Sequence, residues 1–363
     1  MADPPNPATS QETLADLGEW ELIRRLGAFA PPGQFADDAA LLPSTEDRPL
    51  VVNTDVLVEG LHFSETTTAA ADVGWRATAA NLSDLAAMGC TAVVGITVAL
   101  VAPAATPWPW VEGVYGGIKE ALEAYGGVLL GGDCSGGAQR LLAITALGTW
   151  AAEAPGAATA ANQPSTIASS GPIRRCDGFP GDWLVCTGPH GLSRLGLALL
   201  QGELRGGSAA LLDPSLRARA IQAHRRPRPR FDAVRALIAS RPARLDWRVG
   251  GCDSSDGLAA AAAAIAASSG CAAQLDRDAL PLDLAMAGLP QAAAWCLGGG
   301  EDFELVLALE PPWAEALIAA LPGASVVGVL VEGEAGSLGW SDGAPWGPGA
   351  GGRGAPTGYS HFG

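Results

Sequence analysis

The spacing of apolar positions predicts a first α/β segment that ends near residue 150. The pattern predicts helices at 12–28, 71–88 and about 108–125, and strands near 38–42, 49–54, 92–100, 127–131 and 141–149. In the helix at 71–88 the apolar stripe is Trp75, Ala79, Leu82 and Ala86, and Gly89 suits its C-terminal end. Helices and strands mixed in this order are typical of an α/β fold.

The apolar periodicity stops at residues 151–173, which are rich in Ala, Ser and Pro, and it resumes near residue 174. The second part is predicted to contain strands at 182–188 and 303–309, helices at 191–202, 231–240 and 312–321, and a basic turn at 224–230. We therefore expect an N-terminal domain at 1–150, a low-complexity linker or insertion at 151–173, and a C-terminal α/β domain at 174–363 with a Gly-rich insertion near 333–356.

The composition permits large apolar cores and excludes two kinds of partner. Of the 363 residues, 48% are hydrophobic and 17% are charged. The run "TAVVGITVALVAPAA" at 91–105 is too short for a membrane span and is rich in β-branched residues, so we interpret it as a buried strand. A net charge of −16 argues against nucleic acid. We expect neither a membrane nor a nucleic acid as a partner.

Cysteine usage and the N-terminus favour a cytoplasmic protein. The seven cysteines are scattered, odd in number and without a Cys-x-x-Cys, so neither a disulfide framework nor a zinc ribbon is indicated. The acidic N-terminus lacks the features of a secretory signal. The single lysine, Lys119, does not lie in a P-loop. The Gly-x-Gly-x-x-Gly match at 347–352 has no strand before it and no helix after it, so we take it as a chance match.

Acidic residues recur in one context along the chain. Most lie where an apolar, strand-like run meets a turn: Asp37, Asp38, Asp55, Asp133, Asp253 and Asp256. Asp84 instead lies on the helix at 71–88, on the face away from the apolar stripe. Ligands of open α/β sheets gather beyond the strand ends. A single Asp in a turn usually only makes local hydrogen bonds, but five clusters in one recurring context favour a shared site.

Grouped carboxylates need positive charge nearby, because like charges raise each other's pKa and oppose folding. Lysine is almost absent, and no acidic cluster has an arginine beside it in the sequence. Oxygen ligands without a His/Cys cluster favour Mg²⁺ over zinc or copper, and such Mg²⁺ usually carries substrate phosphates. Loop N–H groups of "GGDCSGG" are candidates to assist. These residues predict a metal-dependent phosphoryl-transfer enzyme that uses a nucleoside triphosphate.

A series of motifs follows the order found in one enzyme family: "ADDAALL", "NTDVLVEGLHF", "NLSDLAAMG", "LLGGDCS", "RCDGFPGDW", "DSSDGL", "GGGEDFEL" and "GYSHF". The chain therefore resembles the thiamine-monophosphate kinases, which belong to the superfamily of aminoimidazole ribonucleotide synthetase. The resemblance runs from about residue 18 to the C-terminus, interrupted at 151–173 and 333–356. The pair "NTDVLVEGLHF" and "NLSDLAAMG" is highly specific.

The resemblance implies a two-domain α/β (α+β) fold and a reaction. The N-terminal domain would carry a mixed sheet with helices and pair with that of a second subunit in a homodimer, and the C-terminal domain would be α/β. The enzyme would transfer the γ-phosphate of its co-substrate ATP to thiamine monophosphate, giving thiamine diphosphate. Transfer would be direct and in line, with several Mg²⁺ ions. Because such attack needs charge neutralisation more than a protein nucleophile, no catalytic side chain is expected.

The resemblance also implies site residues, position by position. The metal ligands would be Asp38, Asn53, Thr54, Asp55, Asp84, Asp133, Asp253 and Asp256. ATP would contact Gly132, Asp133, Arg175, Ser255 and Tyr115. The thiamine substrate would contact His62, Glu301 and Tyr359. His62 would bind substrate phosphate or pyrimidine rather than act as a base, and Glu301 would accept a hydrogen bond from the aminopyrimidine.

Some positions depart from the family pattern, and other readings stay open. Ala36 stands where Gly usually precedes the acidic pair, Asn53 replaces Ser or Thr, and Cys134 replaces Thr. Aminoimidazole ribonucleotide synthetase shares the implied fold but would phosphorylate an amide oxygen. Selenophosphate synthetase or a hydrogenase maturation factor would need a reactive Cys before Asp37 or at the C-terminus, where none occurs. A silent nucleotide-binding paralogue is a further alternative, against which the retained Asp positions argue.

Overall fold

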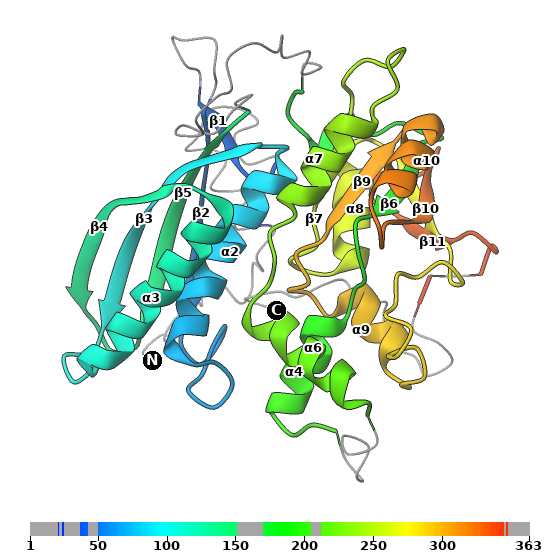
Figure 1. Ribbon diagram of the computed structural model, residues 1–363. Helices are drawn as coiled ribbons and strands as arrows, with labels where there is room; N and C mark the ends of the chain where they lie inside the picture. The colour runs from blue at the N-terminus through cyan, green and yellow to red at the C-terminus, as the bar shows by residue number, and fades with distance from the viewer. Residues whose placement is uncertain are drawn as a thin grey trace, which may run out of the picture.

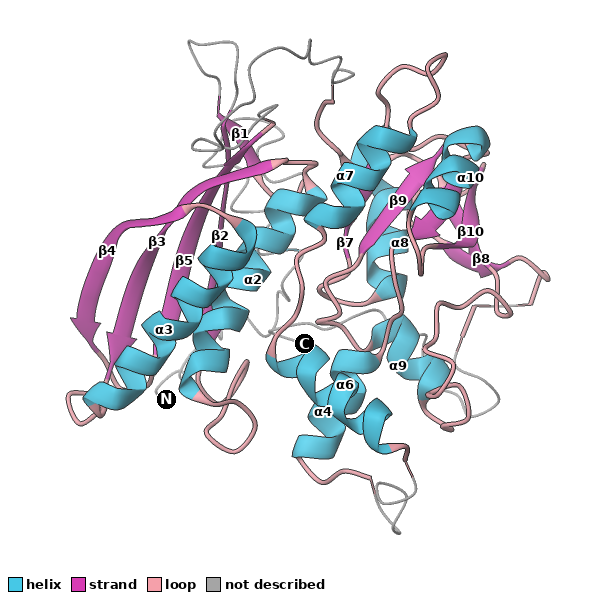
Figure 2. Cartoon of the chain, in the orientation of Figure 1, coloured by secondary structure: helices cyan, strands magenta, loops and turns pink. Residues whose placement is uncertain are grey.

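The computed structural model describes residues 37–42, 50–150, 170–204, 212–344 and 346–347, and before them only Glu21 and Arg24. These residues form two β-sheets with helices packed on them (Figure 1, Figure 2). The mixed α/β fold expected from the sequence is therefore confirmed. The domain limits stay predictions, and most of the helix expected at 12–28 lies outside the described residues. None of the described helices is long and apolar enough to cross a membrane.

The first sheet has five strands in the order β1 (Ala40–Leu42), β2 (Leu50–Val58), β5 (Leu141–Thr149), β3 (Ala92–Ala102) and β4 (Val128–Gly136). Of these neighbours only β3 and β4 are parallel, and α3 (Trp108–Tyr125) is their crossover helix. The helix α2 (Ala70–Ala87) connects β2 to β3 and lies beside α3 on the same face of the sheet (Figure 1).

Side chains alternate between the two faces of the sheet along β2. Val51, Asn53 and Leu57 are buried on the face that the helices cover, whereas Thr54 and Val56 are exposed on the opposite face. The pleat therefore turns the polar side chain of Asn53 into the interior.

The second sheet has six strands in the order β11 (Leu338–Trp340), β8 (Ala272–Leu275), β10 (Ser325–Val331), β6 (Trp183–Cys186), β9 (Leu305–Leu309) and β7 (Gly250–Asp253). On one face packs α8 (Leu258–Ser268), and on the other α7 (Phe231–Ser240) and α10 (Pro311–Ala320). All residues of β9 are buried because both faces of the sheet are covered. The strand β11 lies inside the stretch predicted to be a Gly-rich insertion, so part of 333–356 belongs to the sheet.

A smaller helical group adjoins the second sheet (Figure 1). It contains α4 (Leu192–Leu200), α6 (Pro214–Arg225) and α9 (Ala292–Gly298). The short 3₁₀ helix η2 (Arg175–Asp177) lies elsewhere, against α8 and β7. Leu195 and Leu216 pack in the small core of the helical group. The carboxylate of Asp213 accepts the backbone N–H of Ser215 and so caps α6. The sequence did not predict α6, because its Arg-rich pattern carries only a weak apolar stripe.

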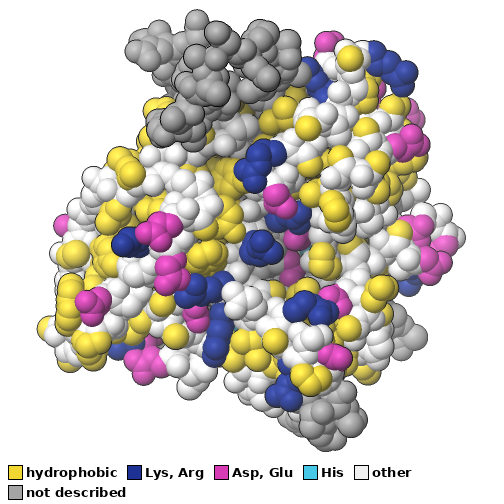
Figure 3. Space-filling view, viewed as in Figure 1, with side chains coloured by type: hydrophobic (Ala, Val, Ile, Leu, Met, Phe, Trp, Pro, Cys, Tyr) yellow, Lys and Arg dark blue, Asp and Glu magenta, His cyan; other side chains and the backbone are white. Residues whose placement is uncertain are grey.

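The helix α2 joins the two halves of the molecule. Thirteen of its 18 residues are buried, because the first sheet and α3 cover one side while β7 and α6 cover the other. Trp75 donates its indole N–H to the carbonyl of Pro227 at 2.8 Å, and Asp72 pairs with Arg226. Figure 3 shows acidic and basic side chains together along the seam between the two halves. A helix buried on so many sides must satisfy its polar residues internally.

Two strands are longer than predicted. The strand β2 continues to Val58 and β4 continues to Gly136, so Asp55 and Asp133 lie within strands rather than in the turns after them. The segment "GGDCSG" is extended because β3 offers a parallel partner along its whole length. The expected phosphate-binding loop at this position is therefore an edge strand.

Two glycines allow α2 and α3 to touch through their backbones. A Cβ at Gly74 would lie 1.9 Å from the carbonyl oxygen of Val114, and a Cβ at Gly117 would lie 1.8 Å from that of Ala71. No side chain fits at either position unless the helices separate. Since α2 also contacts the second half, this close approach helps to set where the two halves meet.

We predict that Gly117→Ala lowers stability by about 1–3 kcal/mol, because the added methyl group forces α3 away from α2. The matched control is Gly116→Ala in the same helix, where a Cβ meets nothing within 4 Å. The free energy of unfolding of the control should rise by up to about 1 kcal/mol, because Ala has a higher helix propensity than Gly. Urea unfolding of both variants measures the difference, and equal midpoints would contradict backbone contact between the helices.

Candidate active site

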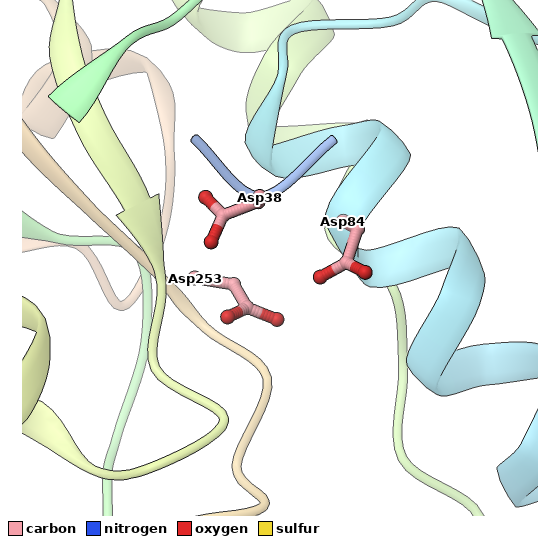
Figure 4. A group of neighbouring side chains, drawn as sticks. All are labelled: Asp38, Asp84 and Asp253. Atoms are coloured by element: carbon pink, nitrogen blue, oxygen red, sulfur yellow. The ribbon is translucent and has the colours of Figure 1, made fainter. Parts of the chain in front are cut away.

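Three carboxylates from distant segments meet between the two sheets. Asp38 lies in the bend before β1, Asp84 lies on α2, and Asp253 ends β7 (Figure 4). Ligand oxygens of the three side chains all lie within 4.8 Å of one another. Among the described residues, this acidic cluster is the group whose spacing suits a metal ion.

Two carboxylates of the acidic cluster, Asp253 and Asp84, have uncharged hydrogen-bond donors. The hydroxyl of Ser83 donates to Asp253 at 2.6 Å, and the hydroxyl of Ser255 donates to its other oxygen at 3.0 Å. The side-chain amide of Asn53 donates to Asp84 at 2.6 Å. These bonds fix the directions of the carboxylates, but they do not balance the negative charge.

The cluster is electrostatically strained. Burial raises the pKa of Asp38 to about 7, although Arg175 acts against the rise, and the carboxylates of Asp253 and Asp37 add to it. Burial also raises the pKa of Asp84 well above its usual range, and the neighbouring acids reinforce the shift. Each shift reflects the same problem, because like charges are held together with little water.

The side chain of Asn53 fits a cation ligand. It is only 7% exposed, and its NH₂ group faces the oxygens of Asp84 and Asn81. Its Oδ1 atom is buried without a hydrogen-bond partner, an arrangement that is rare in folded proteins. Carboxylates with an adjacent free amide oxygen form the hard donor set that Mg²⁺ prefers, so these residues fit the ion expected from the sequence.

The fold brings an arginine to the acidic cluster, although none lies beside an acidic cluster in the sequence. Arg175 forms an ion pair with Asp38, and its backbone N–H donates to Asp37 at 2.8 Å. Arg175 and Asp38 are 137 positions apart, so inspection of sequence neighbours could not reveal the contact. One guanidinium offsets only part of the charge of three carboxylates.

A cavity of about 640 Å³ adjoins the acidic cluster and is lined by six of the predicted site residues. The predicted residues in its lining are Asp55, His62, Asp84, Ser255, Asp256 and Glu301. The backbone N–H of Glu301 donates to the carbonyl of Ser255 at 2.7 Å, which ties the loop before β9 to the turn after β7. Acidic metal-site candidates and substrate-site candidates therefore share one cavity.

The orientation of His62 suits a hydrogen-bond donor. Its Nδ1 accepts the backbone N–H of Val58 at 3.0 Å. A neutral imidazole in this arrangement carries its proton on Nε2. Nε2 of His62 is then a hydrogen-bond donor, and the binding role expected for this residue stays a prediction.

Sequence reasoning missed two residues that line the cavity, Arg76 and His224. Arg76 resembled an ordinary polar position of an amphipathic helix, and His224 belonged to the predicted basic turn. Burial lowers the pKa of His224 to about 4, and Arg76 adds to the shift. His224 is thus neutral at pH 7. The lowered pKa of His224 makes the free energy of unfolding depend on pH. The contribution of the neutral imidazole to stability is complete above about pH 6.5 and is lost as the pH falls through 4.

Asp133 does not join the acidic cluster of its own chain. The register places Val56, Ala143, Ala99 and Asp133 in one row across β2, β5, β3 and β4. Residues in one row share a face, and Val56 lies on the exposed face, opposite to Asp55. Three strand spacings, roughly 14 Å, separate β2 from β4.

Gly132 and Tyr115 lie near Asp133 at the same edge of the sheet. Gly132 precedes Asp133 on β4. Tyr115 extends from α3 to Cys134, and burial together with this neighbour raises the pKa of its phenol. Three of the predicted ATP contacts are therefore grouped at an edge strand, apart from the acidic cluster.

Of the other expected contacts, Thr54 points away from the cavity and Tyr359 is not described. The hydroxyl of Thr54 lies 2.7 Å from that of Thr145 on the exposed face of the sheet, so this side chain points away from the acidic cluster. Tyr359 lies outside the described residues.

Family models match both halves of the chain. The N-terminal domain of AIR synthase related proteins matches residues 36–150, and the C-terminal domain of the same proteins matches residues 180–341. The two matches cover the two sheets separately.

Full-length relatives are similar to this chain over most of its length. A thiamine-monophosphate kinase of Prochlorococcus marinus is 45% identical over 92% of this chain and 94% of its own length. One of Synechococcus elongatus is 46% identical over 89% of this chain and 91% of its own. A solved structure described as AaThiL complexed with AMPPCP and TMP superposes with a TM-score of 0.77 at 26% identity, covering 98% of this chain and all of that one.

We predict that Asp84→Asn raises the melting temperature in EDTA, because the amide keeps the shape of the side chain and removes one of the repelling charges. Mg²⁺ should raise the melting temperature of the unmodified protein and raise that of the variant much less. The control is Asp342→Asn, an exposed carboxylate that pairs with Arg277. Differential scanning calorimetry measures both effects. A variant that is less stable in EDTA, or that keeps the full Mg²⁺ shift, would refute the cluster as a cation site.

Proposed function

The chain belongs to the thiamine-monophosphate kinase family, and from this premise we propose that its cavity phosphorylates thiamine monophosphate with ATP to give thiamine diphosphate. The observation that carries the proposal is the meeting of the acidic cluster with His62 and Glu301 in one cavity. The solved relative with AMPPCP, a non-hydrolysable ATP analogue, and TMP supports the same pair of substrates. The protein is accordingly an enzyme of thiamine diphosphate biosynthesis.

The proposed reaction joins two phosphate groups, so its main obstacle is negative charge. The cavity volume of about 640 Å³ is in the range of small-molecule sites. Neither the proposed roles nor the cavity requires a nucleophilic side chain. We therefore propose direct, in-line transfer without a phosphoenzyme, in which the protein supplies position and charge.

The acidic cluster would hold Mg²⁺ through Asp38, Asp84 and Asp253, with the amide oxygen of Asn53 beside them. Asp55 and Asp256 line the same cavity and would complete the set of oxygen ligands around several ions. Bound Mg²⁺ neutralises charge on phosphate oxygens and helps to align them. Ser83 and Ser255 hold Asp253 in one orientation, so the chain keeps its ligand atoms in place before substrates arrive.

His62 and Glu301 would recognise the acceptor. The Nε2–H of His62 can donate to a phosphate oxygen or a pyrimidine nitrogen, because Nδ1 is already bound to the backbone. Glu301 offers a carboxylate that is about one-third exposed to the cavity and can accept from an aminopyrimidine. Arg175 and Ser255 lie beside the acidic cluster and would contact ATP there.

The exposed edge strand β4 supports a homodimer. Every residue of β4 is exposed, including the large apolar residues Val128, Leu129 and Leu130. A long apolar edge strand is a template for pairing with another chain. We propose that a second copy covers this edge and that Asp133 serves the acidic cluster of its partner, since it lies too far from the cluster of its own chain. Tyr115 and Gly132 would reach ATP in the same way.

A cytoplasmic location stays a prediction. It is supported by the seven cysteines, all of which the structure describes as free thiols that suit a reducing compartment.

We predict that thiamine diphosphate forms only when ATP, Mg²⁺ and thiamine monophosphate are all present. His62→Ala should raise KM for thiamine monophosphate about tenfold and leave KM for ATP within about threefold, because one donor to the acceptor is lost. Chromatography of thiamine diphosphate with coupled detection of ADP measures both. The control is Thr66→Ala in the same loop, an exposed residue outside the lining of the cavity. ATP binding without any thiamine diphosphate would instead indicate a silent paralogue.

We also predict that Asp84→Ala and Asp133→Ala chains are each inactive but recover activity when co-expressed. A mixed dimer has one intact site only if Asp133 acts on the partner's cluster, so random pairing restores about a quarter of the sites. The control pairs Asp84→Ala with Asp55→Ala, two variants of the same cluster, and should recover nothing. No recovery in the first mixture would place Asp133 and the acidic cluster in the same chain's site.

A further inference from the structure

A buried guanidinium lies against both residues proposed to bind the acceptor. Arg76 on α2 is 3% exposed and lines the cavity. Its NH2 group forms an ion pair with Glu301 and lies 3.4 Å from the carbonyl oxygen of His62, to which it donates. Its NH1 group donates to the carbonyl oxygen of His224. One side chain therefore joins the loop after β2, the end of α6 and the loop before β9.

The contacts of Arg76 require the shape of arginine. Its planar fork sends donors in fixed directions toward three acceptors, whereas a lysine ammonium group is a compact charge with no such fork. The third nitrogen, Nε, is buried without a partner. A buried ion pair with an unpaired donor is a weak source of stability. Positioning of the groups it binds explains this residue better than stability does.

Glu301 needs such support. Its backbone φ of 58° is in the left-handed region, which costs an L-residue about 1 kcal/mol or more, and Phe303 next to this loop has a φ of 53°. The bond from Glu301 N–H to Ser255 holds the backbone, and Arg76 holds the carboxylate. The other carboxylate oxygen lies 3.6 Å from Nδ1 of His224. The side chain thus keeps one orientation while about one-third of it stays exposed to the cavity.

We propose that Arg76 is a positioning residue for the acceptor substrate, an inference that rests on the proposed function. His62 belongs to the first half of the molecule and Glu301 to the second, so their separation depends on how the halves are held. Arg76 fixes this separation by binding both. Its side chain is 4% exposed, which leaves little surface for a ligand, so it acts through the two residues it holds.

The test compares Arg76→Met and Arg76→Lys with the unmodified full-length protein. Both variants should raise KM for thiamine monophosphate about 10- to 100-fold, with KM for ATP within about threefold, because charged hydrogen bonds of this kind are lost only on the acceptor side. Arg76→Lys keeps the charge in the buried site and loses the fork. It therefore separates geometry from folding if Arg76→Met is too unstable to purify.

The matched control is Arg226→Met. Arg226 also joins the two halves through α2, where its Nε donates to Asp72 at 2.6 Å, one helical turn before Arg76, but it does not line the cavity. Its loss should lower the melting temperature and leave both KM values unchanged.

The outcomes are distinguishable. If the unmodified protein makes no thiamine diphosphate, the proposed function and this inference are both overturned. If it does, and the Arg76 variants change stability alone or raise KM equally for the two substrates, only this inference is overturned. A selective rise in KM for thiamine monophosphate, absent in Arg226→Met, supports it.

Discussion

The mutual repulsion of buried carboxylates is the constraint on which the arrangement of the two halves depends. Asp38, Asp84 and Asp253 come from three segments that are far apart in the sequence, and the fold brings their oxygens within 4.8 Å. Burial raises the pKa of both Asp38 and Asp84, so the assembled cluster opposes folding when it is ionised. The rest of the structure has to hold the acids together against this force. The packing of two sheets on a shared helix does so, and a bound cation would turn the repulsion into attraction.

The helix α2 holds the two halves together because it is buried on both sides. Its polar residues are spaced so that each meets a different part of the second half: Asp72 meets Arg226, Arg76 meets Glu301, and Ser83 meets Asp253. Glycines on the other side let α3 approach to backbone contact. One rigid element therefore positions the proposed metal site and the proposed acceptor site together. A shift of α2 would alter both, so the two sites are coupled mechanically even though their residues differ.

The local sequence pattern predicted those features of the fold that depend on neighbouring residues. The helix at 108–125 and the strand at 141–149 have the predicted bounds, because periodic apolar positions and flanking Pro or Gly determine them. The six acidic and substrate candidates that line the cavity were named from sequence motifs alone, and their roles stay predictions. What failed depends on contacts between distant segments: β4 extends through Asp133 because β3 pairs with it, and Arg175 reaches Asp38 over 137 positions. Arg76 looked like a surface residue because a helical pattern shows one apolar stripe, whereas α2 has two covered sides.

The same repulsion between carboxylates explains why Asp133 lies on the exposed edge strand β4. If Asp133 belonged to its own chain's cluster, a further carboxylate would crowd the three that already repel one another. On β4 it is instead exposed, with the hydroxyl of Ser135 donating to it at 3.2 Å. A monomer would then leave a nine-residue strand with Val128, Leu129 and Leu130 open to solvent, which favours aggregation. The second copy proposed above would resolve both difficulties at once, since it would cover the apolar edge and add the last carboxylate only where a cation and phosphates can balance it. On this argument the proposed dimer would be the smallest unit with a complete site.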